Sequence, residues 1–334
     1  MTNSSPFFSR PIFDQLTQPG SRLSWLENWL LKEVWSRQRY EAAEDVVQDY
    51  LIEGEKTVRE MEEILAAAAQ RIYDELLETP QPNRDLWHFL TARRPAAAVI
   101  FDGLSLREIP VLMKLAEESN LKIIEFGVSF AAIPSETIDF TEQRLRLSAK
   151  VAPSTLPSRT ELQEVGITSY YLDSPRDRRQ IDPAALSILL WSAFPDQTYR
   201  DSEARFSNHF ATINTVLQTA WQNTVQQIPS HRTILITSDH GYIFFGSGLS
   251  APRTNDVLKP LSKWFGSERN IHLTNGQENI IQHPDIKLIP EKQVAMIRGR
   301  VQTHTTGPDS SKLYKHGGLS VMEMLTPWII LESE

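Results

Sequence analysis

Cysteine is absent from this 334-residue sequence. Its absence excludes disulfide frameworks, thiolate zinc sites and enzymes with a cysteine nucleophile. The sequence also lacks any run of the roughly 18 apolar residues that a membrane-spanning helix needs, and residues 1–19 contain no apolar segment of the kind found in signal peptides. We therefore expect a soluble, cytoplasmic protein that does not bind membranes.

An excess of basic residues is also lacking. The formal net charge is −8, so bulk electrostatic attraction to nucleic acid is not expected, although a local basic patch stays open as an alternative. Hydrophobic residues make up 40% of the chain, which is enough for a substantial core. The length fits one large α/β domain, or such a domain with a helical appendage.

Residues 1–20 contain three prolines and a glycine and are predicted to form an irregular arm. Residues 21–90 form the next unit, in which apolar residues recur at helical spacing. Two or three helices are expected there, with Glu, Lys and Arg on their exposed faces. We interpret this helical region as either a docking surface for other proteins or a structural cap on the domain that follows.

Residues 91–334 have a different character. Short apolar runs are typical of strands buried on both faces of a parallel sheet, and longer amphipathic stretches between them indicate helices. Their alternation predicts an α/β fold with a doubly wound, mostly parallel sheet, in which ligands bind beyond the carboxyl ends of the strands. Strands are expected at 96–101, 122–128, 187–191 and 233–237, helices at 105–118, from 137, and at 201–227, and an insertion with few periodic elements, bordering the active site, at 250–312.

Three short motifs could bind a metal. Asp102-Gly103 ends the first apolar run and Asp239-His240-Gly241 ends another. Carboxylates and neutral imidazole suit zinc or manganese, and Gly241 is expected to permit the tight turn that lets both side chains reach one ion. His316-Gly317-Gly318 is the third, where glycines let the backbone approach a ligand. Each motif has an alternative without a metal. Asp102 could cap the next helix, Asp239-His240-Gly241 could be a turn with a surface histidine, and His316-Gly317-Gly318 could be an ordinary glycine loop.

A candidate nucleophile lies in Pro134-Ser135-Glu136-Thr137, directly before a predicted helix. A hydroxyl at a helix N-terminus lies in positive potential, where phosphate also binds favourably. Plain helix capping by Ser or Thr is the alternative. Thr160 lies in a segment of the same form, so it is a second candidate on chemistry alone.

Together, the motifs resemble those of the PglZ domain, a branch of the alkaline phosphatase superfamily, over about residues 96–332. The resemblance implies an alkaline-phosphatase-type doubly wound sheet preceded by the helical region. It is carried by Val99-Ile100-Phe101-Asp102-Gly103-Leu104, Pro134-Ser135-Glu136-Thr137, Thr237-Ser238-Asp239-His240-Gly241, and His316-Gly317-Gly318-Leu319-Ser320 with Glu323 and Pro327.

The resemblance implies two divalent ions, zinc in the first place or manganese, that bind a transferring phosphoryl group. One ion would be held by Asp102, Asp239 and His240, with the nucleophile as a fourth ligand. In the superfamily the nucleophile follows the first aspartate by a few tens of residues. That spacing favours Thr137 over Thr160, with Ser135 as the second choice.

The second ion would be held by Asp196 and His316 together with a histidine four residues after the aspartate. This sequence departs from that pattern, because Arg200 stands at that position and Arg205 stands four residues after Asp201. His209 could substitute only if its helix began differently. The resemblance therefore implies one or two ions, because the second site lacks one ligand of the family pattern.

The function that the resemblance implies is hydrolysis of a phosphoester, as a phosphodiesterase or phosphatase acting on a nucleotide or nucleic acid. PglZ proteins work beside other proteins in bacteriophage defence and in bacterial signalling, so protein partners are expected. The alternative is a catalytically impaired PglZ-like scaffold or regulatory subunit of a multi-protein defence complex.

Overall fold

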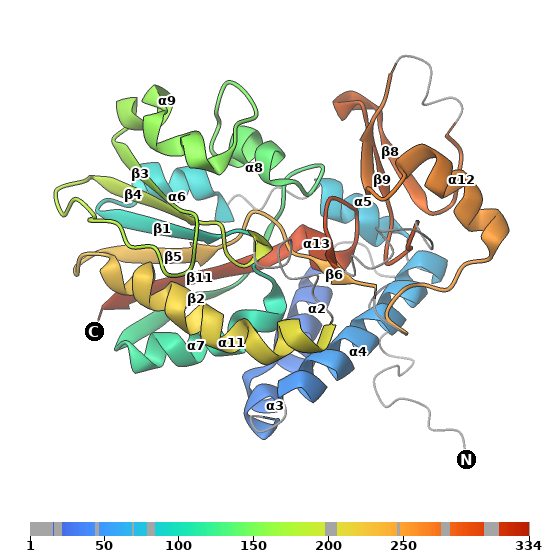
Figure 1. Ribbon diagram of the computed structural model, residues 1–334, viewed down its shortest axis with the longest axis horizontal. Helices are drawn as coiled ribbons and strands as arrows, with labels where there is room; N and C mark the ends of the chain where they lie inside the picture. The colour runs from blue at the N-terminus through green and yellow to red at the C-terminus, as the bar shows by residue number, and fades with distance from the viewer. Residues whose placement is uncertain are drawn as a thin grey trace.

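The computed structural model describes residue 16 and residues 22–43, 47–68, 70–78, 84–197, 206–245, 248–274, 281–303 and 314–333. Apart from Leu16, the predicted arm at 1–20 lies outside these residues. The described chain is an α/β structure with helices preceding the sheet, which confirms the predicted fold class (Figure 1). None of its helices combines the length and the apolar content needed to cross a bilayer.

A six-stranded sheet forms the centre of the molecule, in the order β2-β11-β5-β1-β4-β3. Strands β3, β4, β1 and β5 are parallel neighbours, whereas β11 pairs antiparallel with both β5 and β2, so the sheet is mostly parallel. The strands are β1 (Ala96–Phe101), β2 (Leu121–Phe130), β3 (Ile167–Leu172), β4 (Ser187–Ser192), β5 (Thr233–Thr237) and β11 (Leu325–Ser333).

Strand β1 shows why an unbroken apolar run forms a central strand here. Every residue from Ala96 to Phe101 is buried. Ala97, Val99 and Phe101 belong to the core on one face of the sheet, and their neighbours in sequence belong to the core on the other. Because successive side chains of a strand point to opposite faces, a strand covered on both sides needs apolar residues at every position.

Helices cover both faces of this sheet (Figure 1). α6, α8 and α9 lie on one face, and α7 and α11 lie on the other. Their bounds are α6 (Leu86–Ala92), α7 (Ile109–Glu118), α8 (Thr137–Arg144), α9 (Thr160–Glu164) and α11 (Phe206–Asn223). The single helix predicted at 201–227 differs from the structure, because after Asn223 the chain passes through Thr224 into a separate 3-10 turn at Val225–Gln227.

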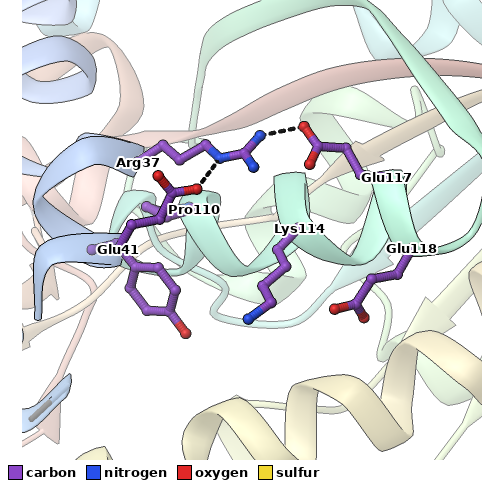
Figure 2. Close-up of a pocket in the computed structure, with 7 residues that line it drawn as sticks. Arg37, Glu41, Pro110, Lys114, Glu117 and Glu118 are labelled. Atoms are coloured by element: carbon purple, nitrogen blue, oxygen red, sulfur yellow. Dashed lines mark hydrogen bonds and ion pairs between the residues drawn. The ribbon is translucent and has the colours of Figure 1, made fainter. Parts of the chain in front are cut away.

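The N-terminal helices pack into the same core as α7 and α11, so they are continuous with the α/β body. Arg37 of α3 pairs with Glu117 of α7 beside a surface pocket between the two helices (Figure 2). The expectation that charged residues of this region are all exposed is wrong for Glu55 and Glu62, which are buried. The elements are α2 (Arg22–Trp29), a π-helical turn (Leu30–Val34), α3 (Arg37–Ala42), α4 (Val47–Ala68) and α5 (Arg71–Glu78).

Residues 250–312 contain more regular structure than their sequence indicated. Helix α12 (Asn255–Phe265) packs with an antiparallel sheet of order β7-β9-β8 around a small core of its own. Strands this short give little periodic signal, which explains why the sequence did not reveal them. The strands are β7 (Asn270–His272), β8 (Ile286–Ile289) and β9 (Val294–Ile297).

Candidate metal centre

The chain brings all five predicted metal-binding side chains to one edge of the sheet. Asp102 follows β1, Asp196 follows β4, and Asp239 and His240 follow β5. These three strands are parallel neighbours, so their carboxyl ends meet at the same edge, where α/β sheets bind ligands. His316 arrives from a distant part of the sequence.

A short antiparallel ribbon places His316 beside the β5 turn. β6 (Ile243–Phe244) begins three residues after His240, and β10 (Tyr314–Lys315) ends directly before His316. The two strands pair with each other, which brings the segments that carry the histidines side by side. The imidazole rings stack, with centroids 4.0 Å apart and planes 11° from parallel.

The first group of candidate ligands is Asp102, Asp239 and His240. Nε2 of His240 lies 3.7 Å from Oδ1 of Asp102 and 3.5 Å from Oδ2 of Asp239. The Asp239 carboxylate is fully buried, and although Oδ1 accepts a hydrogen bond from the backbone N–H of Gly103 at 3.0 Å, Oδ2 has no hydrogen-bond donor within the described structure. A buried carboxylate oxygen without a donor fits a cation ligand.

The tautomer of His240 can be assigned from its neighbours. Nδ1 lies 3.0 Å from the carbonyl oxygen of Gly241, which can only accept, so Nδ1 carries the proton and Nε2 carries the lone pair. Burial lowers the pKa of His240 below its usual value, although the charge of Asp239 opposes that shift, so the ring is neutral at pH 7. A lone pair and carboxylate oxygens thus face one another, and a divalent cation between them removes the repulsion. The donor set fits zinc or manganese.

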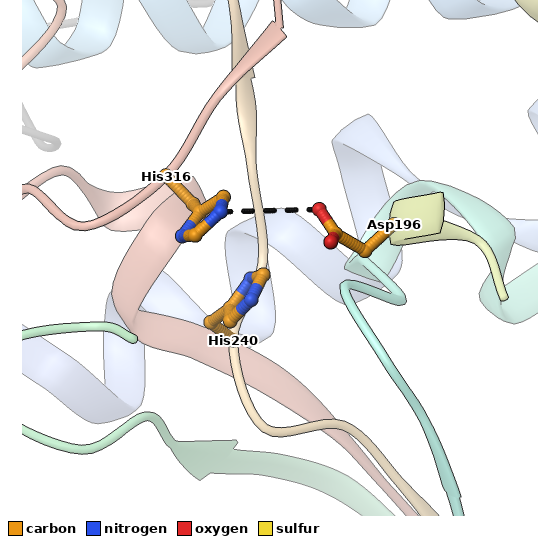
Figure 3. A group of neighbouring side chains, drawn as sticks. All are labelled: Asp196, His240 and His316. Atoms are coloured by element: carbon orange, nitrogen blue, oxygen red, sulfur yellow. Dashed lines mark ion pairs between the residues drawn. The ribbon is translucent and has the colours of Figure 1, made fainter. Parts of the chain in front are cut away.

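A second group contains Asp196, His240 and His316 (Figure 3). Nε2 of His316 lies 3.8 Å from Oδ1 of Asp196, which also accepts a hydrogen bond from the hydroxyl of Tyr314 at 3.0 Å. The backbone N–H of Asp196 donates to the carbonyl of Asp102 at 2.9 Å, which fixes the two strand-end turns relative to each other. The two groups share His240, and its single Nε2 lone pair can bind only one ion.

The two candidate nucleophiles occupy different environments. Thr137 is the first residue of α8, and its Oγ1 lies 3.2 Å from Nε2 of His240. The hydroxyl of Ser135 is buried, donates to the carbonyl of Gly318 at 2.9 Å and accepts from the N–H of Gly317 at 3.1 Å. Ser135 therefore anchors the loop that carries His316. Thr160, the other sequence candidate, is exposed at the start of α9.

Gly241 is required for a reason other than the one expected from the sequence. It is not among the glycines with positive φ. Instead, a Cβ at Gly241 would lie 2.0 Å from the carbonyl oxygen of Met322, and its N–H donates to the carbonyl of Glu323 at 3.0 Å. Close approach of the segment before β11, and not turn conformation, therefore excludes a side chain here.

The glycines after His316 likewise make room for protein side chains. A Cβ at Gly318 would lie 2.5 Å from Nε of Arg269. Arg269 is buried and donates to both oxygens of Glu323, at 2.6 and 2.9 Å, while Oε1 of Glu323 also accepts from the N–H of Gly318 at 2.9 Å. Glu323 thus supports the His316 loop. The sequence did not point to Arg269, because nothing in its local pattern marks it as buried.

Helix α4 contributes two buried glutamates that stabilise the segments around the candidate metal centre. Glu55 forms a fully buried ion pair with Arg107, whose Nη2 donates to the carbonyl of Tyr242 at 2.9 Å. Glu62 accepts from the backbone N–H of Val321 at 2.6 Å. These contacts reach the segments that follow Asp102, His240 and His316 in the sequence. Helical periodicity alone gave no indication of these contacts, because in the sequence a buried glutamate of a helix cannot be distinguished from a glutamate on its solvated face.

The second predicted site departs from the expected pattern at Arg200 and Arg205, where the resemblance would place a histidine. Arg200, Asp201 and Arg205 lie outside the described residues, and the side chain of His209 does too. Within the described part of the chain, the second group therefore contains Asp196 and His316 beside the shared His240.

No protein-family model matches the chain, and no curated protein sequence matches it. Solved structures with similarity include phosphonoacetate hydrolase from Sinorhizobium meliloti 1021 in complex with phosphonoacetate, at 12% identity and a TM-score of 0.39 over 71% of this chain and 90% of that one. Murine ectonucleotide pyrophosphatase / phosphodiesterase 5, as an inactive variant in complex with AMP, has 13% identity and a TM-score of 0.42 over 70% of this chain and 87% of that one. The human protein of that name has 12% identity and a TM-score of 0.39.

Proposed function

We propose that this protein is a metal-dependent phosphoester hydrolase of the PglZ type within the alkaline phosphatase superfamily, with Thr137 as its nucleophile. One observation carries the proposal. The hydroxyl of Thr137 lies 3.2 Å from Nε2 of His240, at the same point on which buried oxygens of Asp102 and Asp239 converge. A hydroxyl placed at a cation-binding group is the arrangement that phosphoryl transfer through a covalent intermediate needs.

The charge of the site supports metal dependence. The carboxylates of Asp102, Asp196 and Asp239 surround the imidazoles, and Glu136 lies 3.3 Å from His316. A phosphoester is itself an anion, so this concentration of negative charge would repel it without bound cations. When bound, divalent ions neutralise charge on the transferring oxygens and lower the pKa of a coordinated hydroxyl.

The residues of the chain supply the nucleophile and the ligands of the ions. Oγ1 of Thr137 bonds to phosphorus as the bond from phosphorus to the alcohol oxygen breaks, and the proton that the Thr137 hydroxyl gives up ends on the leaving alcohol. Water then hydrolyses the phosphothreonine and restores the hydroxyl. Asp102, Asp239 and His240 would hold the first ion and Asp196 and His316 the second, with zinc the preferred metal and manganese the alternative.

Aryl phosphodiester turnover tests the proposal directly. The protein is stripped of metal, reloaded with Zn²⁺ or Mn²⁺, and assayed with bis(p-nitrophenyl) phosphate. We expect Thr137→Ala and Asp239→Ala to lose at least about a hundredfold in kcat. Thr160→Ala is the matched control, since Thr160 is an exposed threonine at the start of another helix, and it should keep wild-type turnover. Unchanged turnover in Thr137→Ala would rule out the nucleophile.

A second candidate function rests on the second group of ligands. Among the described residues it holds only Asp196 and His316 apart from the shared His240, which fits a catalytically impaired PglZ-like scaffold in a multi-protein assembly. Elemental analysis separates the two functions. Two ions per chain together with turnover support the hydrolase, and no bound ion supports the scaffold.

The biological setting belongs to the same proposal. PglZ-type proteins act beside other proteins in bacteriophage defence and signalling, and we propose that setting here, with a nucleotide or nucleic acid as the phosphoester substrate. Comparing turnover of p-nitrophenyl thymidine monophosphate with that of bis(p-nitrophenyl) phosphate tests the substrate class. A nucleotide substrate predicts a lower KM for the thymidine ester.

A further inference from the structure

Glu136, which directly precedes Thr137, contacts the histidine on the other side of the site. Its Oε2 lies 3.3 Å from Nδ1 of His316, and the carbonyl oxygen of Ser135 lies 3.3 Å from the same nitrogen. A carbonyl oxygen can only accept a hydrogen bond, and a carboxylate beside the same nitrogen also favours a proton there, so Nδ1 of His316 carries a proton. For the neutral ring, Nε2 then holds the lone pair, and it is Nε2 that lies 3.8 Å from Asp196.

Two further features fix the Glu136 carboxylate in this position. Its Oε1 accepts a hydrogen bond at 2.8 Å from Nδ2 of Asn270, on strand β7 of the small sheet. A Cβ at Gly317 would lie 2.2 Å from the same Oε1, and Gly317 has a φ of +94°. The loop after His316 is thus shaped to accommodate the carboxylate, and the small sheet orients it.

The Glu136 side chain is 28% exposed, so it contributes less to the buried core than Arg269 or Glu323. A partly exposed carboxylate that is held by two neighbours and touches a candidate ligand has a different role from a core ion pair. In metal sites, a carboxylate on the second nitrogen of a histidine sets the tautomer and the orientation of the ring, and its loss typically reduces metal affinity about 10- to 100-fold.

We propose that Glu136 is a positioning residue of the metal centre. Together with the carbonyl of Ser135 it holds His316 in the Nδ1-protonated tautomer, and it orients the ring so that Nε2 faces Asp196, while Asn270 orients the Glu136 carboxylate. The inference rests on the proposed function, because it assigns Glu136 a role toward the ion that Asp196 and His316 would bind. It also gives the 250–312 region a place in the site, through Asn270.

Metal affinity and a spectroscopic signature test this role without relying on turnover. Zn²⁺ affinity is measured by competition with a chromophoric chelator, and the visible spectrum of the Co²⁺-loaded protein reports ligand geometry. We expect Glu136→Ala to weaken the ion bound by His316 about 10- to 100-fold and to alter the Co²⁺ spectrum. Glu136→Gln should recover only part of the loss, because its one amide oxygen can face Nδ1 of His316 but its NH2 group then replaces the acceptor for Asn270. Asn270→Ala should show a smaller loss than Glu136→Ala.

Matched controls keep the outcomes separate. Glu142→Gln, in the helix α8 that follows Glu136, should leave affinity and spectrum unchanged. Thermal unfolding of the metal-free variants checks that each one folds. If Glu136→Ala does not fold, Glu136→Gln carries the test with the same expected direction. Wild-type affinity and spectrum in the folded variants would overturn the role of Glu136. Asp239→Asn separates failure of the Glu136 role from failure of the proposed metal centre. If Asp239→Asn also binds metal with wild-type affinity, the proposed metal centre is wrong.

Discussion

Replacing Glu62 with Gln should stabilise the protein, and increasingly so as the pH rises. Glu62 lies on α4 with only 2% of its surface exposed. Its Oε1 accepts from the N–H of Val321 at 2.6 Å, and its Oε2 lies 4.0 Å from Nε of Arg300. Burial raises the pKa of Glu62 from its ordinary 4.5 to about 7, against the opposing charge of Arg300.

The direction of the pH dependence follows from whether the folded or the unfolded state binds the proton of Glu62 more tightly. Because the folded pKa lies above the unfolded one, protonated Glu62 favours folding, and that contribution is fully present below pH 4.5 and is lost as the pH rises through 7. At 1.36 kcal/mol per pKa unit, the raised pKa of Glu62 lowers the free energy of unfolding, relative to a side chain that stays neutral in both states, by about 1 kcal/mol at pH 5 and about 3 kcal/mol at pH 8. Gln keeps the acceptor for Val321 and carries no charge, so Glu62→Gln should recover these amounts.

Urea unfolding of the metal-free protein, followed by tryptophan fluorescence between pH 5 and pH 8, measures the difference between variant and wild type. Glu63→Gln is the matched control. Glu63 is the next residue on α4, is 33% exposed and pairs with Arg253 at 3.5 Å, so its replacement should change stability by less than about 1 kcal/mol. A Glu62→Gln difference that stays constant across this pH range would refute the reasoning, as would a wild type that is more stable than the variant at pH 8.

Three further outcomes are expected from the same structure. Gly241→Ala should lower the free energy of unfolding by at least about 2 kcal/mol in chemical denaturation, because its Cβ would meet the carbonyl oxygen of Met322 at 2.0 Å. Arg269→Met should lower it by about 3 to 5 kcal/mol, because Glu323 would stay buried without its cationic partner; a loss below 1 kcal/mol would contradict this. Zn²⁺ at about 100 times its Kd should stabilise the wild type by about 2.7 kcal/mol, seen as a higher Tm, and should leave the Tm of Asp239→Ala unchanged.

Much of the α/β framework was accessible from the sequence because its signals are local. The run at 96–101 and the centre of the run at 233–237 are apolar at successive positions, which fits a strand covered on both faces, and both form central strands. The convergence of Asp102 with Asp239 follows from that topology, since adjacent parallel strands end at one edge of the sheet. Helix α8 begins at Thr137 as predicted, although its N-cap residue, Glu136, makes no capping hydrogen bond with its side chain.

The parts that the sequence did not reveal depend on pairings between distant residues. Glu55 with Arg107, and Arg269 with Glu323, are buried ion pairs whose members are 52 and 54 residues apart. On a helical pattern a glutamate of α4 resembles one on a solvated face, and only the assembled fold shows that it is enclosed. The reason for Gly241 was missed for the same cause, because its neighbour Met322 comes from the far end of the chain.

His240 determines how many ions the proposed centre can hold tightly. It belongs to both candidate groups, yet its Nδ1 is committed to the carbonyl of Gly241, and so one lone pair on Nε2 serves both. The Asp102 and Asp239 side has two buried carboxylates and the Thr137 hydroxyl within reach, so the first ion should take His240 there. Asp196 and His316 are then the described ligands left for a second ion, fewer than the three protein ligands typical of catalytic zinc. With so few ligands, the orientation that Glu136 gives to His316 should matter more for the second ion than for the first.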